Sequence, residues 1–358
     1  MKMPQKIKTV LKILDRIIMA VLILAACLVA WLTVNEFDPE TVETVPVSIQ
    51  GENKEIKPVL KEKIRVLTFN IGYGNLGKES DFFMDGGKNV RNGDKELVLK
   101  NLGGIIDTLY NADADIYFIQ EADIKSKRSF KINEMHSIEV SLGGRTSFAK
   151  NYSCDFVPFP LPPIGAVESG IMTNTEFYIE TGERISLPCP FRWPVSAANL
   201  KRCLLINRCE IEGSDKELVM INLHLEAYDS GEGKIAQTKM LWDILESEYA
   251  KGNYVIAGGD FNQSFPGAEE KYPIFTAELW EPGVLEESDL PEGWQYVYDS
   301  SVPTCRLLDK PYDEKTSQHY VIDGFIISPN VELLYAETLD CGFEFSDHNP
   351  VLMEVVLK

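Results

Sequence analysis

Short apolar runs that end on a carboxylate, an amide or an imidazole constrain this chain more than any other feature of its sequence. "VLTFN" ends at Asn70, "YFIQE" ends at Glu121 and "VIAGGD" ends at Asp260. Runs of this length, rich in β-branched and aromatic residues, predict buried strands. Polar residues that end strands lie in the loops, where side chains can converge on a ligand. The sequence therefore predicts a cluster of polar side chains at the carboxyl ends of several strands.

The same pattern recurs along the rest of the chain. A lone Asp or Asn at a strand end is usually a turn or cap residue, whereas several such ends in one chain indicate a shared site. The other residues of this kind, each at or beside the end of an apolar run, are Asn222, His224, Asn262, Asp323, Asp347 and His348.

These residue types indicate the chemistry of the site. Carboxylate and amide oxygens without cysteine ligands suit a hard cation such as Mg²⁺, which one or two carboxylates hold together with substrate phosphate. Two histidines add proton transfer or phosphate contact near neutral pH. Together they indicate metal-assisted phosphoester hydrolysis, with water activated on one side of phosphorus and the leaving oxygen stabilised on the other.

The predicted strands outnumber the predicted helices. Residues 94–113 and 233–252 carry apolar side chains at helical spacing. Many of the strands are apolar on both faces, so the fold class is α/β, with two packed mixed β-sheets flanked by helices. Strands are predicted over residues 63–71, 115–121, 169–174, 203–211, 217–225, 254–262, 320–328 and 351–357.

The N-terminal region predicts one transmembrane helix. Ile17–Val34 carries no charge over 18 residues, which at about 1.5 Å per residue nearly spans a bilayer core of about 30 Å. Basic residues precede this run and acidic residues follow it, so the N-terminus should be cytoplasmic and the remainder extracytoplasmic. We expect residues 1–35 to form a basic segment and single-pass cell-membrane anchor, residues 36–62 an extracytoplasmic linker, and residues 63–358 the catalytic domain.

Two other interpretations of the N-terminus stay open. "LAAC" is compatible with a bacterial lipoprotein signal in which Cys27 is lipidated, although the apolar run continues beyond it. A cleaved signal peptide is the other, without a clear cleavage site. The six remaining cysteines lack the paired spacing of a zinc site, and they fit buried hydrophobes as well as disulfides.

The charge balance argues against general binding of nucleic acid. The chain carries a formal net charge of −20 although its first 35 residues are basic. The remainder is therefore strongly acidic and supplies little attraction for phosphate backbones. A local basic groove, such as one formed by Arg192, Lys201 and Arg202, would still suffice for DNA.

The order of the motifs "TFNI", "IQE", "NLHL", "GGDFN", "IDGFIIS" and "SDHNPV" resembles the endonuclease/exonuclease/phosphatase superfamily. Its DNase I-like fold is shared by neutral sphingomyelinases and inositol-polyphosphate 5-phosphatases. The resemblance covers residues 63–358, and "GGDFN" and "SDHNPV" are its most specific parts. It implies a four-layer α/β sandwich and a phosphoester hydrolase that uses Mg²⁺, with Mn²⁺ or Ca²⁺ as alternatives.

The resemblance implies a role for each motif residue. Glu121 would be the main metal ligand, with Asn70 and Asp347 beside it. Asp260 would orient or deprotonate the attacking water, and Asn262 would hold the phosphate.

The remaining motif residues would contact or position the substrate. His348 would contact the phosphate oxygens, and Asp323 would fix the tautomer of its imidazole. His224 matches the second histidine of the DNase and sphingomyelinase branches. Asn222, on the same strand face as His224, and Tyr152 are candidate substrate-binding residues, with a packing role as the alternative for Tyr152.

Three further polar residues have weaker support. Arg128, soon after Glu121, either steers a phosphate or belongs to a solvated basic face, and the solvated face is the better interpretation. His136 and His319 match no motif of the resemblance, so we expect each to be a solvated or a core histidine.

The substrate stays open at the level of sequence. The two-histidine pattern favours a phosphodiester, which could be nucleic acid, a phospholipid headgroup or a small phosphodiester. The loops that carry Phe156, Phe159, Phe191 and Trp193 fit contact with lipid as well as ordinary packing. Alternative functions are a phosphomonoesterase of the same fold and an inactive tethered scaffold. We expect a monomer.

Overall fold

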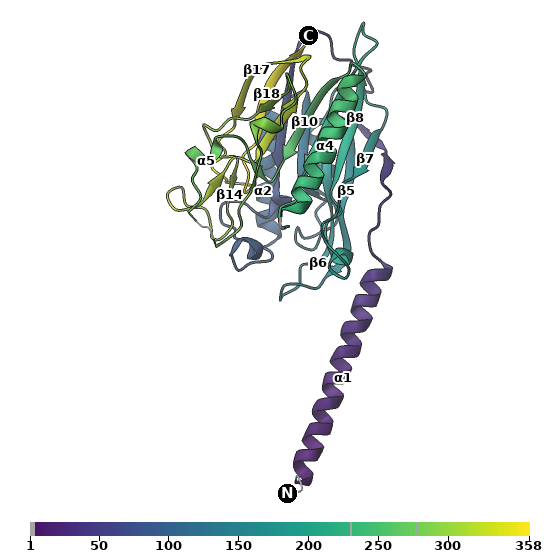
Figure 1. Cartoon of the computed structure of the whole chain (residues 1–358), viewed down its shortest axis with the longest axis vertical. Coiled ribbons are helices and arrows are strands. Elements are labelled where there is room, and N and C mark those ends of the chain that lie inside the picture. Colours follow the sequence, from purple (N-terminus) through teal and green to yellow (C-terminus); the bar gives the residue numbers. More distant parts are fainter. Residues whose placement is uncertain (1–3, 230, 276–277) are drawn as a thin grey trace.

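Two seven-stranded sheets packed face to face form the centre of the protein (Figure 1). The structure is a computed structural model that describes residues 4–229, 231–275 and 278–358. The order of the first sheet is β1 (Val42–Val45), β7 (Gly182–Ser186), β8 (Cys203–Glu210), β9 (Glu217–His224), β10 (Tyr254–Asp260), β16 (Asp323–Ile327) and β13 (Gln295–Val297). The order of the second is β17 (Val331–Thr338), β18 (Val351–Leu357), β3 (Lys63–Asn70), β4 (Ile116–Asp123), β6 (Gly165–Thr175), β5 (Gly144–Val157) and β2 (Val47–Gln50).

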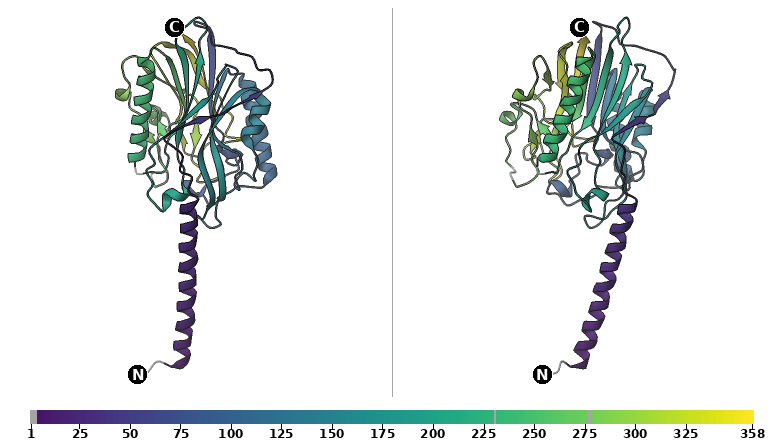
Figure 2. Two further views of the ribbon diagram at one scale, coloured as in Figure 1. Left: turned by 90° about the vertical axis from the view of Figure 1, so that its right-hand side faces the viewer. Right: turned by 45° about the vertical axis from the view of Figure 1, so that its right-hand side comes forward.

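Helices cover the outer faces of both sheets (Figure 2). α4 (Glu232–Ala250) packs on the first sheet, and α2 (Lys95–Ala112) and α3 (Glu134–Leu142) pack on the second. Between the sheets lies a core that includes Phe118 and Phe325, and burying such a side chain contributes about 1.5–3 kcal/mol. This arrangement confirms the predicted α/β class with four layers.

α1 (Gln5–Val34) projects away from the sheets as a single long helix (Figure 1). Among the described residues it is the one helix long and apolar enough to cross a membrane, and nearly all of it is exposed. Its length and composition agree with the predicted transmembrane segment.

The segment predicted as a linker, residues 36–62, contains two short strands, β1 and β2. β1 pairs with β7 at the edge of the first sheet, and β2 pairs with β5 at the edge of the second. Burial alternates along β1, as expected of an edge strand that packs one face, whereas the two central residues of β2 are both exposed. The segment thus ties α1 to both sheets.

Most predicted strands and both predicted helices are confirmed. One predicted strand is divided into two in the structure. The run 320–328 contains β16 and part of a separate short strand, β15 (His319–Tyr320), which pairs with β14 (Cys305–Arg306). The sequence did not predict β5, because it is rich in polar residues and lacks a clear apolar run. Some of these polar residues are buried and form hydrogen bonds inside the molecule. Ser147, for example, donates to the Asn207 side chain at 2.8 Å.

The end of α4 is joined to the first sheet by a carboxylate with several donors. Arg208 on β8 contacts both oxygens of Glu248 at 2.7 and 2.9 Å, and Lys251 and Asn253 donate to them at 2.7 and 3.0 Å. Burial alone would raise the pKa of Glu248, but these donors outweigh it and lower the pKa to about 2. The ionised form therefore stabilises the folded state.

Glu248→Gln is expected to lower the free energy of unfolding at pH 7 by about 2 kcal/mol. This energy is smaller than the pKa shift alone would give, because solvent screens the partly exposed Arg208. A lowered folded-state pKa contributes stability that is complete above the unfolded pKa and is lost as the pH falls through the folded one. The difference between wild type and variant should therefore disappear between about pH 5 and pH 2. Denaturant unfolding at several pH values measures it.

Asp243→Asn is the matched control for this prediction. Asp243 also pairs with a lysine on α4, Lys239 at 3.2 Å, but both side chains are exposed. An exposed pair of this kind contributes about 0–1 kcal/mol. A loss at pH 7 no larger for Glu248→Gln than for Asp243→Asn would contradict the prediction.

Candidate active site

The pairing of strands brings predicted site residues to one end of the first sheet. β9 and β10 are parallel, with His224 opposite Asp260 where both strands end. β16 is antiparallel to β10, and its first residue, Asp323, is the other register partner of Asp260. Three residues that are far apart in the sequence therefore lie side by side across three adjacent strands.

The second sheet presents its own polar residues to the same point. β3 and β4 are parallel, and the pairing of Asn70 with Gln120 places Glu121 just beyond the end of β3. The Asn70 Nδ2 atom donates to Asp260 Oδ2 at 3.0 Å and lies 3.4 Å from Glu121 Oε1. Its Oδ1 atom accepts the Gly72 N–H at 3.0 Å. Asn70 thus joins the two sheets and positions a carboxylate on each.

Glu121 has an unusual backbone conformation. Its φ angle is +58°, and the β4–β6 pairing is irregular between Ile119 and Ala122. A non-glycine residue in the left-handed region costs about 1–3 kcal/mol, and such strain is concentrated at functional sites. The irregularity turns the Glu121 side chain, which is 25% exposed, towards His224 Nε2 at 3.9 Å. Glu121 can therefore reach a ligand.

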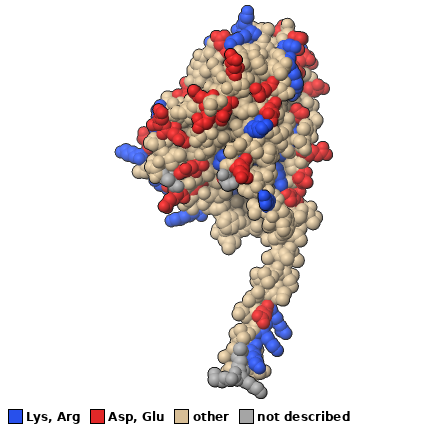
Figure 3. Space-filling view, in the orientation of Figure 1, with Lys and Arg blue, Asp and Glu red and all other residues tan. Residues whose placement is uncertain are grey.

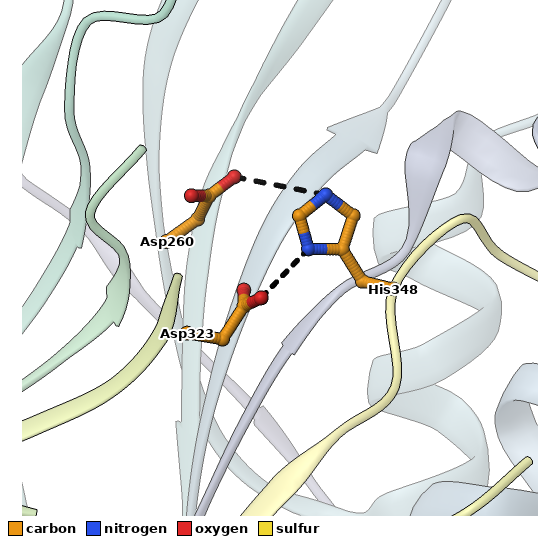
Figure 4. A group of neighbouring side chains, drawn as sticks. All are labelled: Asp260, Asp323 and His348. Atoms are coloured by element: carbon orange, nitrogen blue, oxygen red, sulfur yellow. Dashed lines mark hydrogen bonds and ion pairs between the residues drawn. The ribbon is translucent and has the colours of Figure 1, made fainter. Parts of the chain in front are cut away.

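Asp323 orients the imidazole of His348 (Figure 4). The Asp323 Oδ2 atom lies 2.8 Å from His348 Nδ1, and His348 Nε2 points towards Asp260 Oδ2 at 3.8 Å. Burial alone would lower the pKa of His348, but the carboxylates of Asp323 and Asp347 outweigh it and raise this pKa well above its usual value. This geometry favours a protonated imidazole with Nε2 free to meet an anion.

His224 has the opposite character. Its Nε2 atom lies 3.4 Å from Asp260 Oδ2. Burial, followed by the positive charges of Arg202 and His348, lowers the pKa of His224 well below its usual value. Arg202 also donates to the His224 carbonyl at 3.2 Å. The site thus pairs a neutral imidazole with a charged one on either side of Asp260.

Two buried carboxyl groups have raised pKa values. Burial and the neighbouring Asp323 raise the pKa of Asp260 to about 6. Burial, together with the charge of Glu121, raises the pKa of Asp347 to about 7. A Cβ atom on Gly72, whose φ angle is +51°, would lie only 2.7 Å from Asp347 Oδ1, so the backbone approaches this carboxyl closely. The site concentrates carboxyl groups that repel one another.

The residues fit a divalent cation. Glu121 and Asp347 supply hard oxygen donors, and a cation between these two carboxylates would relieve their repulsion. Asn70 lies beside them, with its amide nitrogen towards Glu121 and its amide oxygen bonded to the Gly72 N–H. Ligand atoms of Asp260, Asp323 and His348 also lie close enough together to hold a metal ion. We favour the first set, because the His348 Nδ1 atom of the second is already paired with Asp323.

Asn262 lies beside Asp260 in a second left-handed conformation, with a φ angle of +50°. Its backbone N–H donates to Asp260 Oδ1 at 2.8 Å, and its side-chain amide donates to the Leu225 carbonyl at 2.9 Å. A side-chain amide carries two N–H bonds, and the Leu225 carbonyl accepts one of those of Asn262.

Both residues that the sequence predicts as substrate-binding are buried and hydrogen-bonded within the protein. Asn222 is fully buried between the sheets, where its amide donates to the Met172 carbonyl at 2.7 Å and accepts from Gln120 at 2.8 Å. Tyr152 is also buried, and its hydroxyl donates to the Ala198 carbonyl at 3.1 Å. Asn222 is a bridge between sheets, and Tyr152 has the packing role.

Two interpretations of basic residues are corrected. Arg128 is not on a solvated face: it is paired with Asp123 at 2.9 Å and stacked on Tyr73 at 3.7 Å. The predicted basic groove does not form either, because Arg202 is buried against Glu226 at 3.3 Å. The other two residues differ as well, since Lys201 pairs with Glu36 at 2.5 Å and Arg192 is exposed.

The two unassigned histidines lie outside the site, as expected. His136 is largely exposed and pairs with Glu139 at 2.8 Å. His319 stacks on Phe343 with ring centroids 5.8 Å apart.

Sequence reasoning missed several residues that build the site. Ser346 Oγ donates to the Asn70 carbonyl at 2.8 Å and accepts the His348 N–H at 3.2 Å, so it connects β3 to the loop before β18. Its position in "FSDHNP" was a usable signal. Asp85 and Tyr228, joined at 2.8 Å, come from two distant loops, and no local pattern marks them.

Several solved structures share the fold of this chain. An endonuclease/exonuclease/phosphatase protein from Beutenbergia cavernae superposes with a TM-score of 0.58 at 17% identity, over 83% of this chain and 72% of that one. A family member from Bacteroides vulgatus gives 0.53 at 14% identity, over 83% of this chain and all of that one. The chain has the DNase I-like fold of the endonuclease/exonuclease/phosphatase proteins, as its motifs predict.

Two further comparisons match proteins with the name TDP2 or tyrosyl-DNA phosphodiesterase 2. TDP2 from Caenorhabditis elegans superposes with a TM-score of 0.50 at 15% identity, over 83% of this chain and 75% of that one. Tyrosyl-DNA phosphodiesterase 2 from Gallus gallus is 28% identical over 168 residues, which are 44% of this chain. This chain spans 42% of the length of that relative. No family model matches the sequence.

Proposed function

We propose that this protein is a membrane-anchored, extracytoplasmic, divalent-metal-dependent phosphodiesterase. The observation that carries the proposal is the convergence of Asn70, Glu121, Asp260, Asp323 and His348 from two sheets onto one point. Carboxylates, amides and one charged imidazole fit a phosphate with a cation. The name of the Gallus gallus relative, a phosphodiesterase, agrees with this chemistry.

The chain's own residues divide the work of hydrolysis. Asp260 lies between the two imidazoles, where it would orient an attacking water and accept its proton. Asn262 and protonated His348 would donate to the phosphate oxygens as negative charge develops on them. Neutral His224 would hold the water or substrate on the other side of Asp260.

A divalent cation would be held by Glu121 and Asp347 with Asn70. It would supply charge stabilisation to the phosphate and the leaving oxygen. Mg²⁺ is the proposed ion because oxygen ligands and substrate phosphate suit it, and Mn²⁺ or Ca²⁺ would fit the same donors.

The proposed location follows from α1. Lys6, Lys8, Lys12 and Arg16 lie near its N-terminal end, and acidic residues follow its C-terminal end. The positive-inside rule then places the two sheets outside the cytoplasm.

A nuclease is the weaker version of the proposal. The basic groove considered from sequence is taken up by Glu36 and Glu226. Duplex DNA would need several phosphate contacts from Lys and Arg, and the acidic globular part offers few.

The function is tested by hydrolysis of two chromogenic esters. The full chain in detergent with Mg²⁺ should cleave bis-p-nitrophenyl phosphate faster than p-nitrophenyl phosphate, and EDTA should abolish both reactions. Preference for the monoester would instead indicate a phosphomonoesterase. Absence of both activities, with no effect of Mg²⁺ on the melting temperature, would favour an inactive scaffold.

A further inference from the structure

The C-terminal end of α1 is fixed against the globular part. Leu32 is buried in a cluster with Tyr152 and Ala197. The Trp193 indole donates to Thr33 Oγ1 at 2.9 Å, and Lys201 pairs with Glu36 at 2.5 Å. These contacts set the position of the helix relative to the sheets.

The helix leaves the globular part at the end where the candidate active site lies. β8 is antiparallel to β9, so its first residues lie beside the last residues of β9, with Leu204 opposite Leu223. Arg202, just before β8, contacts the His224 carbonyl. Figure 1 shows α1 departing from the end opposite the C-terminus of β18, and His348 precedes that strand.

Four large apolar side chains are exposed around this exit, and we call them the apolar rim. They lie on two loops that start from the cluster burying Leu32, because Val157 and Ile164 flank one loop and Ala197 belongs to the other. Exposed apolar side chains that gather in one place mark an interaction site. The apolar rim consists of Phe159 (69% exposed), Leu161 (89%), Trp193 (61%) and Val195 (56%).

The apolar rim lies at the depth where α1 would leave a bilayer. Thr33, the partner of Trp193, is the second-last residue of the uncharged run Ile17–Val34. That run is about 27 Å long, close to the thickness of the hydrocarbon core. Trp193 therefore lies at the level of the headgroups, where tryptophan is enriched. Figure 3 shows that, on the face drawn, the end of the globular part next to α1 is mostly uncharged.

Basic residues flank the apolar rim, and we call them the basic fringe. Lys127 donates its backbone N–H to the Ala166 carbonyl, two residues beyond Ile164 at the base of the apolar-rim loop. An anionic membrane surface attracts exposed basic side chains beside a membrane segment. The basic fringe consists of Arg91, Lys125, Lys127 and Lys131, all exposed in an otherwise acidic globular part.

We propose that the apolar rim and the basic fringe rest in the headgroup layer of the bilayer that α1 spans. The candidate active site then faces the membrane surface and acts on phosphodiesters displayed there rather than on diesters free in solution. This inference rests on the proposed membrane anchor and on the proposed hydrolysis. The tests below distinguish failure of the membrane anchor, of the proposed hydrolysis and of this inference.

The first test measures the depth of Trp193. The full chain carrying Trp31→Phe is reconstituted in phosphatidylcholine vesicles with one fifth anionic lipid, and lipids brominated near the headgroup are added as quenchers. We expect quenching that is lost when Trp193→Phe is added. Equal quenching with and without Trp193 would overturn the proposal. Failure of the chain to float with the vesicles would remove the anchor and this inference with it.

The second test compares substrates. A p-nitrophenyl phosphodiester carried on a diacyl lipid in the vesicles is set against soluble bis-p-nitrophenyl phosphate. Phe159→Ser combined with Leu161→Ser should slow hydrolysis of the lipid-borne ester about tenfold and leave the soluble reaction unchanged. Tyr110→Ser, at a residue equally exposed (69%) near the end of α2, should change neither rate.

The outcomes of the second test are distinguishable. Equal loss on both substrates would mean that the rim variant damages the site itself, which contradicts the proposal. An unchanged rate on both would also overturn it, while the proposed function would stand. Absence of hydrolysis of both esters in the wild type would overturn the proposed function instead.

Discussion

Glu121→Gln is expected to lower the turnover of bis-p-nitrophenyl phosphate by about 10³-fold while leaving the fold intact. Loss of one group that stabilises developing charge lowers kcat by about 10²–10³-fold. The variant would also lose the cation and its contribution to catalysis. Glu121 is the most exposed carboxylate of the site, and its side chain is directed towards His224 from a left-handed backbone conformation. Glutamine keeps the size of the side chain and removes its charge. Initial rates with saturating Mg²⁺ measure the effect.

The same variant separates metal binding from structure. Mg²⁺ should raise the melting temperature of the wild type, because a ligand at 100 times its Kd stabilises the folded state by about 2.7 kcal/mol. Glu121→Gln should abolish that rise. Glu168→Gln is the control. Glu168 lies on β6, the neighbour of β4, and pairs with Lys150 on β5 at 3.5 Å. This variant should keep both the normal hydrolysis rate and the normal Mg²⁺-induced rise in melting temperature. A near-normal rate in Glu121→Gln with a normal Mg²⁺ shift would contradict the assignment.

His348→Asn is expected to slow hydrolysis by about 10²–10⁴-fold, the contribution typical of a positioned catalytic imidazole. The His348 Nε2 atom is directed towards Asp260, and the ring is held by Asp323 through Nδ1. His319→Asn is the control, because His319 is a stacked histidine outside the site. If His348→Asn were no slower than His319→Asn, the proposed role of His348 would be wrong.

Asp323 acts through His348, so Asp323→Asn should cost about 10–100-fold, as for other residues that orient a catalytic imidazole. The double variant should be no slower than His348→Asn alone, because residues that work as one unit are not additive. Additive losses, accompanied by a lower melting temperature, would show that Asp323 has a structural role instead. Rates and melting curves of all four chains complete the cycle.

The strands that form the site could be predicted because their signals are local. Largely apolar runs mark β4, β9 and β10, and polar residues lie at or near the carboxyl end of each strand. The positions of Glu121, His224 and Asp260 at one end of the sheets follow from parallel pairing. The meeting of Asp260 and Asp323 does not, because it depends on the antiparallel pairing of β10 with a strand more than 60 residues later.

Side-chain direction and depth were harder to predict. Alternation along β9 correctly places Asn222 and His224 on one face, but two residues of strand span about 7 Å, and that distance separates the mouth of the site from the fully buried interior. Arg128 follows a run of lysines that resembles a solvated surface. Its burial depends on Asp123 and Tyr73, which only the folded chain brings to it.

The hydrogen bond from Asn70 to Asp260 joins residues 190 positions apart, one on each sheet. Neither half of the chain contains all of these side chains, so under the proposed function a nascent polypeptide would have no working centre. Such a hydrolase would be silent throughout its synthesis and would acquire its activity only when the last long-range contacts close. Folding itself would then act as the activating step.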